Sequence, residues 1–269
     1  MEAAKPFQIP NAVQWTMRNK QGATYRIMLW RPDTKAPPNG FPVYYLLDAN
    51  AIFATVTETI RVQSSGPRKQ EPAVVVGIGY DSDLPHVTQR RFVDYTLPAS
   101  SEELSKRKNG MDWPKNGGIE SFLDFIEEEV MPEIDRWIAI DHTRQAIFGH
   151  SLGGFCVLYT LCTRSHLFHY YAAGSPSIWW KNHIIHTYVQ KYLAEASSDH
   201  TRHIRLFIGV GSEEPAGMAD GAKEVFQKVK AAKGTGLTTR FARYQGESHI
   251  SMLLPFLSQV VRDFREECI

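Results

Sequence analysis

The sequence predicts a single α/β domain over residues 1–269, in which a mostly parallel, twisted sheet is covered by helices on both faces. Two observations predict this fold. Short, nearly continuous apolar runs at 43–47 and 74–78 are bounded by Pro, Gly or Asp, as is typical of strands buried on both faces. From residue 118 onward, strand-like runs alternate with apolar residues at helical spacing, and such alternation is typical of a parallel sheet.

The individual elements follow in chain order. We expect strands at 13–17, 25–30, 43–47, 74–78, 146–148, 170–173, 206–210 and 240–244. We expect helices over 122–130, directly after Gly149, and near 183–195, 219–232 and 250–264. Residues 80–118 fit the alternation poorly, because they are polar and rich in Arg, Lys and Pro. They predict an insertion that shapes a substrate site.

Charge and composition exclude several classes of protein. Thirty Lys and Arg balance twenty-nine Asp and Glu, so we expect no nucleic-acid partner. No apolar run approaches the ~20 residues of a membrane span, and the N-terminus lacks the pattern of a secretory signal. The three cysteines, Cys156, Cys162 and Cys268, have no metal-type spacing. A cytoplasmic protein is expected, although an exported protein whose signal had been removed would look the same; the oligomeric state is left open.

The candidate nucleophile is Ser151, in the GxSxG pattern that follows the strand at 146–148. A sharp strand-to-helix turn exposes such a serine, and we expect Gly149 and Gly153 to satisfy its steric demand. The turn also directs the backbone N–H of Leu152 toward a developing oxyanion. His150 is expected to point away from the catalytic face as a packing residue.

The candidate base is His249, in the loop after the last predicted strand, as the order serine, acid, histidine requires. The acid should follow the strand at 206–210, where Glu214 is the first choice and Glu213 the second. These carboxylates could instead cap the next helix. The second oxyanion donor is expected after the third strand, from the N–H of Asn50 or of the adjacent Ala49.

Three further pairs of histidines are spaced by three residues: His166/His169, His183/His186 and His200/His203. Spacing of three can place both rings on one helical face. None of the pairs has the acidic companion that a zinc site usually shows. We therefore expect solvated helix faces and loops here, and neither a metal nor a cofactor is required by the chemistry.

With these residues placed, the chain resembles the trilactone siderophore esterases of the enterobactin and bacillibactin type, in the esterase-D-like branch of the α/β-hydrolases. The phrases that carry the resemblance are YLLDANAIF at 45–53, GIGYDSD at 77–83, RFVDYTLP at 91–98, DHTRQAIFGHSLGGF at 141–155, GSPSIWW at 174–180 and GESH at 246–249. The resemblance implies hydrolysis of macrocyclic or linear hydroxy-acid esters, which releases siderophore fragments and helps iron release. Whether the ferric or the iron-free siderophore is the preferred substrate is left open.

The resemblance also implies roles for two residues outside the triad. Arg91 is expected to line the pocket and contact a polar or catecholate substrate. The alternative is a structural arginine paired with Asp94 or another carboxylate. Trp180 is expected either in the pocket wall or in the apolar core.

Several functions stay open beside siderophore hydrolysis. Ala49 stands where a glycine is expected, and residues 100–115 look individual to this chain. A general short-chain carboxylesterase and an acyltransferase remain alternatives. An inactive ligand-binding homologue is the alternative from another class. Some members of the resembled group work with a Ser–His pair, which leaves the acid open.

Overall fold

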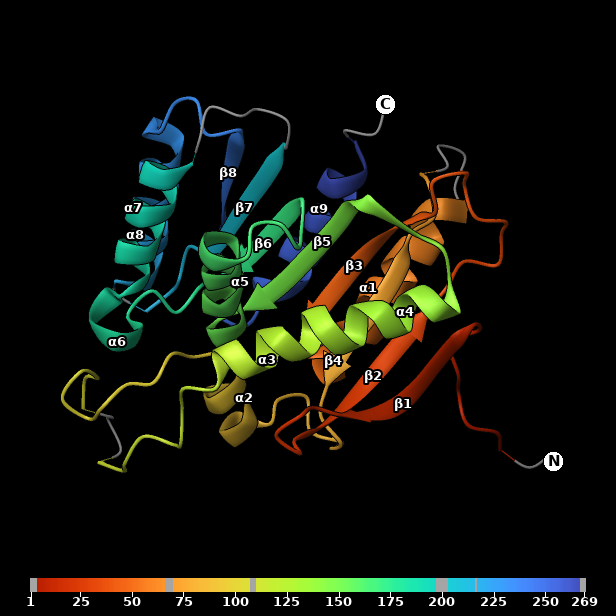
Figure 1. Ribbon diagram of the computed structural model, residues 1–269, viewed down its shortest axis with the longest axis horizontal. Helices are drawn as coiled ribbons and strands as arrows, with labels where there is room; N and C mark the ends of the chain where they lie inside the picture. Colours follow the sequence, from red (N-terminus) through yellow and green to blue (C-terminus); the bar gives the residue numbers. More distant parts are fainter. Residues whose placement is uncertain (1–3, 66–69, 107–109, 197–202, 216, 267–269) are drawn as a thin grey trace.

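The structure is a computed structural model that describes residues 4–65, 70–106, 110–196, 203–215 and 217–266. One eight-stranded sheet runs through these residues, in the order β1-β2-β4-β3-β5-β6-β7-β8 (Figure 1). The strands are β1 (Ala12–Arg18), β2 (Thr24–Trp30), β3 (Phe41–Leu47), β4 (Val74–Gly79), β5 (Ile140–His150), β6 (Tyr170–Gly174), β7 (Ile204–Gly211) and β8 (Leu237–Tyr244). Strands β1 and β2 are antiparallel to their neighbours, and β3 to β8 are parallel. The predicted mostly parallel α/β fold is therefore confirmed.

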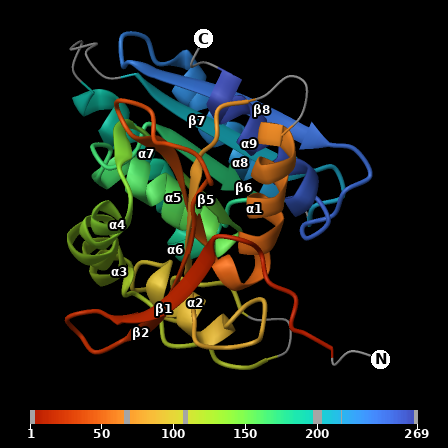
Figure 2. The ribbon, with the colours of Figure 1, turned by 90° about the vertical axis from the view of Figure 1, so that its right-hand side faces the viewer.

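Helices cover both faces of the sheet, because side chains of the buried strands alternate between two apolar clusters. In β3, Tyr45 and its alternate neighbours pack in one cluster, and Tyr44 and Leu46 pack in the other. Helices α1 (Ala49–Ser65) and α9 (Leu253–Glu266) cover the Tyr44 face. The opposite face carries α3 (Ile119–Phe125), the π-helical turn η1 (Ile126–Val130), α4 (Met131–Trp137), α5 (Leu152–Thr163), α7 (Ile185–Glu195) and α8 (Met218–Ala231). Figure 2 shows α1 and α9 on one side and α3, α4 and α5 on the other.

The predicted strands are all present, and the differences concern length and helices. Strand β5 spans Ile140–His150 rather than 146–148, because the polar stretch before Ala146 also pairs with β3 across an irregular register. Residues 49–65, which carry no predicted element, form α1. Its buried Ile52, Val56 and Ile60 are four residues apart, but its many Val, Thr and Ile residues have low helix propensity and obscure the pattern.

Among the described residues of the segment 80–118, α2 (Thr88–Asp94) is the one regular helix. A second short helix, α6 (Trp180–His183), precedes α7. The N–H of Asn182 donates to the carbonyl of Glu103 at 3.2 Å, so the turn after Trp180 holds part of the segment. That the segment shapes a substrate site stays a prediction.

The parallel strands bring distant parts of the chain to one edge, since their carboxyl ends all point the same way. Asp48 follows β3, Ser151 follows β5, Glu214 follows β7 and His249 follows β8. This edge lies at the bottom of Figure 1. Within the residues that the structure describes, no helix has the length and apolar character to cross a membrane.

Candidate active site

Ser151 occupies a strained turn between β5 and α5. Its φ of 60° and ψ of −115° lie in a region that residues with a side chain rarely adopt. Two backbone bonds hold the turn against the neighbouring strand: the N–H of Ser151 donates to the carbonyl of Gly174 at 2.9 Å, and the N–H of Ser177 donates to the carbonyl of Ser151 at 3.0 Å. The turn presents the serine side chain at the carboxyl edge of the sheet.

The steric demand of this turn is met by Gly149 and Gly154. A Cβ on Gly149 would lie 2.3 Å from the carbonyl oxygen of Gly153, and a Cβ on Gly154 would lie 2.8 Å from that of Gly174. A Cβ on Gly153 would make only ordinary contacts, the nearest at 3.5 Å from the carboxylate of Asp48. The expected requirement for glycine at 153 is therefore wrong, since the crowded position is the next one.

His249 bridges the serine and a carboxylate. Its Nε2 lies 3.1 Å from Oγ of Ser151, and its Nδ1 lies 2.9 Å from Oε2 of Glu214. A carboxylate oxygen can only accept, so Nδ1 carries the proton and the free Nε2 accepts from the serine hydroxyl. The imidazole is 24% exposed, so solvent and substrate can reach it. This is the arrangement of a nucleophile, a general base and an orienting acid.

Glu214 is buried at this position, with 1% of its side chain exposed. Its Oε1 accepts from the N–H of Gly211 at 3.2 Å and from the hydroxyl of Ser175. Burial alone would raise the pKa of Glu214, but hydrogen bonds from His249 and Ser175 outweigh it and hold the pKa below its usual value. The carboxylate is therefore ionised at neutral pH and can stabilise an imidazolium.

The other predicted roles for the acidic pair do not match the geometry. The side chain of Glu213 is exposed, and its backbone N–H donates to the carbonyl of Glu247 at 2.9 Å. Helix α8 begins at Met218 after Gly217, which provides no side-chain cap. Glu214 is thus the carboxylate that contacts His249, and neither glutamate caps this helix.

His150 is a buried packing residue, as expected, but its ring lies against that of the candidate base rather than away from the catalytic face. Its Nε2–H donates to the backbone carbonyl of His249 at 2.8 Å, and the two ring centroids are 4.7 Å apart. Burial, and after it the nearby His249, lower the pKa of His150 to about 3. His150 is therefore neutral near pH 7 and cannot replace His249 as the base, but it fixes the backbone that carries His249.

The two predicted oxyanion donors lie at the N-termini of α5 and α1. These helices follow β5 and β3, which are neighbouring strands. Leu152 begins α5 and Asn50 is the second residue of α1, and an N–H in a first turn has no carbonyl four residues earlier to bind. The side chain of Asn50 bonds the backbone N–H and carbonyl of Tyr80 at 2.8 and 2.9 Å. Only the backbone of Asn50 is left to face a substrate, and its role as donor stays a prediction.

Arg91 lies close to these residues in an ion pair. Its Nε donates to Oδ1 of Asp48 at 2.8 Å, and its Nη2 donates to the carbonyl of His150 at 3.2 Å. The carboxylate partner is Asp48, because Asp94 instead pairs with Arg90 at 3.3 Å. Only 12% of the Arg91 side chain is exposed. A contact between Arg91 and substrate stays a prediction.

Trp180 belongs to the core, so its predicted place in the pocket wall is corrected. Its side chain is 0% exposed, and its Nε1–H donates to the carbonyl of Leu97 at 2.9 Å. The ring packs against Phe92, Trp113 and Trp179 at centroid distances of 5.8, 6.1 and 5.6 Å. A fully covered ring cannot contact a substrate without moving, which leaves the core role that the sequence also allowed.

Ser175 and Ser177 are site residues without a predicted role. Ser175, at φ 38°, donates its hydroxyl to Glu214, and Oγ of Ser177 lies 3.4 Å from Oγ of Ser151. Both follow the carboxyl end of β6, which pairs with β5 directly beside the nucleophile. The sequence feature that could have identified them is their position directly after the predicted parallel strand at 170–173, since loops after parallel strands gather at one edge of the sheet.

Two of the histidine pairs, His166/His169 and His183/His186, lie wholly within the described residues. His166 lies 2.8 Å from a carboxylate oxygen of Glu127, and the rings of His183 and His186 stack at 6.4 Å. His200 lies outside the described residues, as does Cys268. Across the described part of the chain, no three His, Cys, Asp or Glu side chains cluster as metal ligands.

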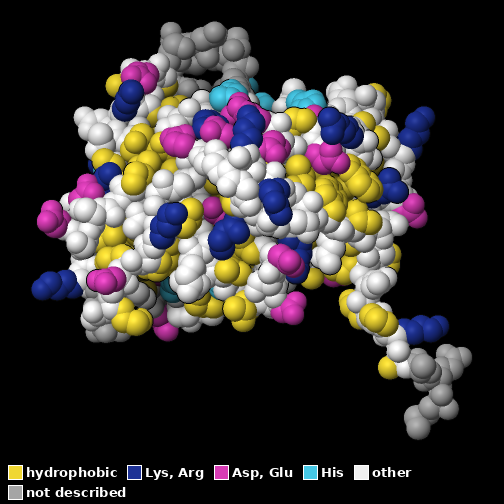
Figure 3. All heavy atoms as spheres, turned by 60° about the horizontal axis from the view of Figure 1, so that its bottom comes forward, with side chains coloured by type: hydrophobic (Ala, Val, Ile, Leu, Met, Phe, Trp, Pro, Cys, Tyr) yellow, Lys and Arg dark blue, Asp and Glu magenta, His cyan; other side chains and the backbone are white. Residues whose placement is uncertain are grey.

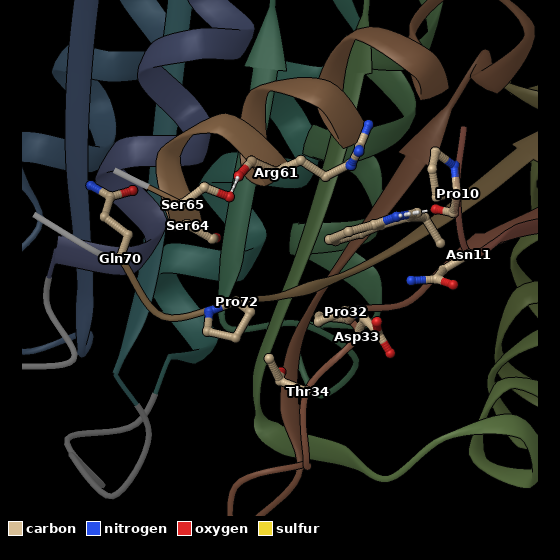
Figure 4. A pocket seen from close by; sticks show the side chains of 11 residues that line it. Pro10, Asn11, Pro32, Asp33, Thr34, Arg61, Ser64, Ser65, Gln70 and Pro72 are labelled. Atoms are coloured by element: carbon tan, nitrogen blue, oxygen red, sulfur yellow. Dashed lines mark hydrogen bonds between the residues drawn. The ribbon is translucent and has the colours of Figure 1, made fainter. Parts of the chain in front are cut away.

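A pocket of about 480 Å³ lies at the opposite edge of the sheet (Figure 4). Arg61 and Ser64 near the end of α1, Trp30 at the end of β2 and Pro72 before β4 contribute to its lining. It contains none of the triad candidates. Figure 3 brings the lower edge of Figure 1 forward and shows acidic and basic side chains interspersed with hydrophobic ones. Charges of both signs are mixed over the coloured part of this face.

Comparisons with known proteins show the family of the chain. The Esterase family model matches residues 19–251. The ferri-bacillibactin esterase BesA of Bacillus subtilis (strain 168) is 38% identical over 262 residues, which cover 95% of this chain and 90% of BesA. A siderophore enterobactin esterase of Emericella nidulans is 32% identical over 238 residues, covering 85% of this chain and 78% of that protein.

Solved structures show the same fold. The crystal structure of BES protein from Bacillus cereus has a TM-score of 0.92 at 33% identity, over 98% of this chain and 99% of that chain. The resemblance to siderophore esterases is thus confirmed over nearly the whole length. The chain belongs to the Esterase family and is a carboxylic ester hydrolase with the α/β-hydrolase fold.

Proposed function

We propose that the chain hydrolyses ester linkages of a siderophore through an acyl-enzyme formed on Ser151. The observation that carries this proposal is the continuous line of contacts from Oγ of Ser151 through the imidazole of His249 to Glu214, at 3.1 and 2.9 Å. Both distances are within hydrogen-bond range, which a general base needs in order to activate a serine.

The reaction proceeds in two acyl transfers. His249 removes the proton of Ser151 while Oγ attacks the ester carbonyl, and Glu214 stabilises the imidazolium that forms. The imidazolium then gives its proton to the leaving alcohol. Water attacks the acyl-enzyme with His249 again as base, which releases the acid and restores the serine.

The tetrahedral intermediate requires donors for its oxyanion. We assign this role to the N–H groups of Leu152 and Asn50, which lie at the N-termini of α5 and α1. Ala49 is the alternative source of the second donor. The loss of one such donor in a comparable enzyme costs about 3–4 kcal/mol of transition-state stabilisation.

The substrate class comes from the relatives, whose names specify ferri-bacillibactin and enterobactin. We extend this class to the present chain, so that cleavage of a ferric siderophore contributes to iron release. We further propose that residues 80–118 shape the substrate site, supported by the contact of Arg91 with the residue before Ser151. A cytoplasmic location is part of the proposal, supported by the free thiols of Cys156 and Cys162.

A fluorophosphonate probe tests the mechanism independently of the natural substrate. We expect one probe per wild-type chain and none on Ser151→Ala, because only an activated serine reacts. A folded wild-type protein that takes up no probe would support an inactive binding homologue instead. Product analysis with added alcohols separates hydrolysis from acyl transfer, since a transferase would form a new ester in preference to the free acid.

A product assay tests the substrate class. Trilactone siderophores with and without iron are compared with a short-chain nitrophenyl ester, and Ser151→Ala is the control. We expect kcat/KM for a trilactone to exceed that for the simple ester by at least tenfold. Activity on the nitrophenyl ester alone would leave a general carboxylesterase and remove the siderophore from the proposal.

A further inference from the structure

We infer that Arg91 is a positioning residue of the oxyanion hole, holding the loop after β3 against the residue that precedes Ser151. The inference rests on the proposed function, because it takes Leu152 and Asn50 as the oxyanion donors. It assigns Arg91 a role in the transition state that differs from recognition of a charged substrate.

The guanidinium connects two separate segments of the site. Its Nε–H bonds Oδ1 of Asp48 at 2.8 Å, and its Nη2–H bonds the carbonyl of His150 at 3.2 Å. Asp48 lies two residues before Asn50, and His150 lies two residues before Leu152. Arg91 therefore ties together the short segments that carry both N–H donors, although these donors follow different strands.

The Asp48 segment needs such support because its backbone is strained. Asp48 has a φ of 54°, in the left-handed region, which is unfavourable for a residue with a side chain. Its N–H donates to the hydroxyl of Tyr95 at 3.1 Å, and its carboxylate binds Arg91. Helix α2 and the residue after it thus hold both the backbone and the side chain of Asp48.

Charge gives Arg91 a second effect on the same step. The carboxylate of Asp48 is buried, and its Oδ2 lacks a hydrogen-bond partner among the described residues. This oxygen is 3.5 Å from the position of a Cβ on Gly153, in the first turn of α5. An unbalanced negative charge there would repel the oxyanion, so the cation of Arg91 favours the transition state by neutralising it.

The orientation of Arg91 also differs from that of a free substrate anchor. Its charged group lies between Asp48, the carbonyl of His150 and the ring of Tyr95, whose centroid is 5.8 Å from Cζ. A guanidinium already engaged on these sides has little freedom to follow a flexible substrate. An anchor for substrate would change mainly KM, whereas a positioning residue changes kcat.

The test compares Arg91→Lys and Arg91→Met with the wild type on a neutral nitrophenyl ester and on a catecholate ester. We expect kcat to fall by about 10²–10³ with KM within about threefold, as for removal of an oxyanion donor. The loss should be equal on both esters. A rise in KM confined to the catecholate ester, with kcat retained, would overturn the inference in favour of substrate recognition.

A boronic acid supplies a readout that general structural damage would not move selectively. Its tetrahedral adduct on serine places an oxygen in the oxyanion hole, so its affinity should fall by the same factor as kcat/KM. The double variant Asp48→Asn/Arg91→Met removes both charges, and we expect it to regain at least tenfold in kcat over Arg91→Met. The charge and positioning roles would be contradicted if kcat did not recover in the double variant and the Arg91 variants bound the boronic acid as tightly as the wild type.

Controls separate folding from function. Arg90→Lys is the matched control, because Arg90 is the adjacent residue of α2 and pairs with Asp94 instead of Asp48; its kcat should stay within twofold. If the Arg91 variants do not fold, Tyr95→Phe removes the other support of Asp48, and we expect about a tenfold loss in kcat at constant KM. Unchanged kcat in a folded Tyr95→Phe protein would then refute the inference. Fluorophosphonate labelling of the wild type tests the underlying function separately.

Discussion

Replacing Glu214 by glutamine tests the acid of the triad at nearly constant volume. In the structure, Oε2 faces Nδ1 of His249 at 2.9 Å, while Oε1 accepts from Gly211 and Ser175. If the glutamine NH₂ faced His249, the imidazole would have to place its proton on Nε2, where it could no longer accept from the serine. If the NH₂ turned the other way, it would face the N–H of Gly211 and the hydroxyl of Ser175, both of which donate to Oε1 of Glu214.

The expected loss follows from the geometry of the ion pair. An imidazolium and a carboxylate with charges ~4 Å apart interact by about 4 kcal/mol at an effective dielectric constant of ~20. Since ~1.4 kcal/mol corresponds to a factor of ten in rate, removal of the charge should lower kcat about 10³-fold. Loss of the correct imidazole tautomer acts in the same direction, and the analogous change in serine proteases costs ~10⁴.

The assay measures kcat and KM of Glu214→Gln on an ester with a poor leaving group, whose departure needs the imidazolium proton. KM should stay within a few-fold, because Glu214 is buried behind His249. Glu213→Gln is the matched control and should keep wild-type activity, since its side chain is exposed. A loss below tenfold in Glu214→Gln would show that Ser151 and His249 work as a pair, and it would refute the reasoning from charge.

Three further changes have distinct expected outcomes. Burial lowers the pKa of His150 to about 3 in the folded protein, against about 6.5 for an ordinary histidine. The unfolded chain therefore binds an extra proton between these pH values, and the free energy of unfolding falls as pH falls. From pH 7 to pH 5, urea unfolding should show about 2 kcal/mol more loss in the wild type than in His150→Gln, and parallel profiles would contradict this. Gly149→Ala puts a Cβ 2.3 Å from a carbonyl oxygen, so we expect about 1–3 kcal/mol of destabilisation and at least a hundredfold loss of fluorophosphonate labelling. A folded variant that is fully labelled would contradict this expectation. Trp180→Phe should lower the unfolding free energy by about 1–3 kcal/mol without changing KM; a higher KM at full stability would return Trp180 to the pocket wall.

The triad candidates show why some tertiary contacts could be predicted from local patterns. A nucleophile on a strand-to-helix turn needs glycine near it. The glycines around Ser151 show this requirement in the sequence itself, without a structure. Parallel strands place the loops that follow them at one edge, so Glu214 and His249 could be assigned once their strands were recognised. Helix α1 was not predicted because its β-branched residues oppose the helix that its buried face requires.

Contacts between side chains of distant segments were decided by packing alone. Nothing in the sequence near Arg91 distinguishes Asp48 from Asp94 as its partner. In the packed molecule, Arg91 pairs with Asp48, and the adjacent Arg90 pairs with Asp94. Trp180 could occupy the pocket wall or the core until its neighbours Phe92 and Trp113 enclosed it. The approach of His150 to the carbonyl of His249 likewise depends on how the loop after β8 returns to the end of β5.

The sequence by itself therefore determined the parallel α/β fold, the family resemblance, and the candidates Ser151, His249 and Glu214. Periodicity, turn chemistry and chain order can be read along the chain, and they were enough to predict the fold and these three residues. The tertiary structure decided that Glu214 rather than Glu213 contacts His249, and that Gly154 rather than Gly153 is sterically required. It also placed Arg91 between Asp48 and His150. Such contacts arise from side-chain directions and distances in the packed molecule, which no spacing along the chain specifies.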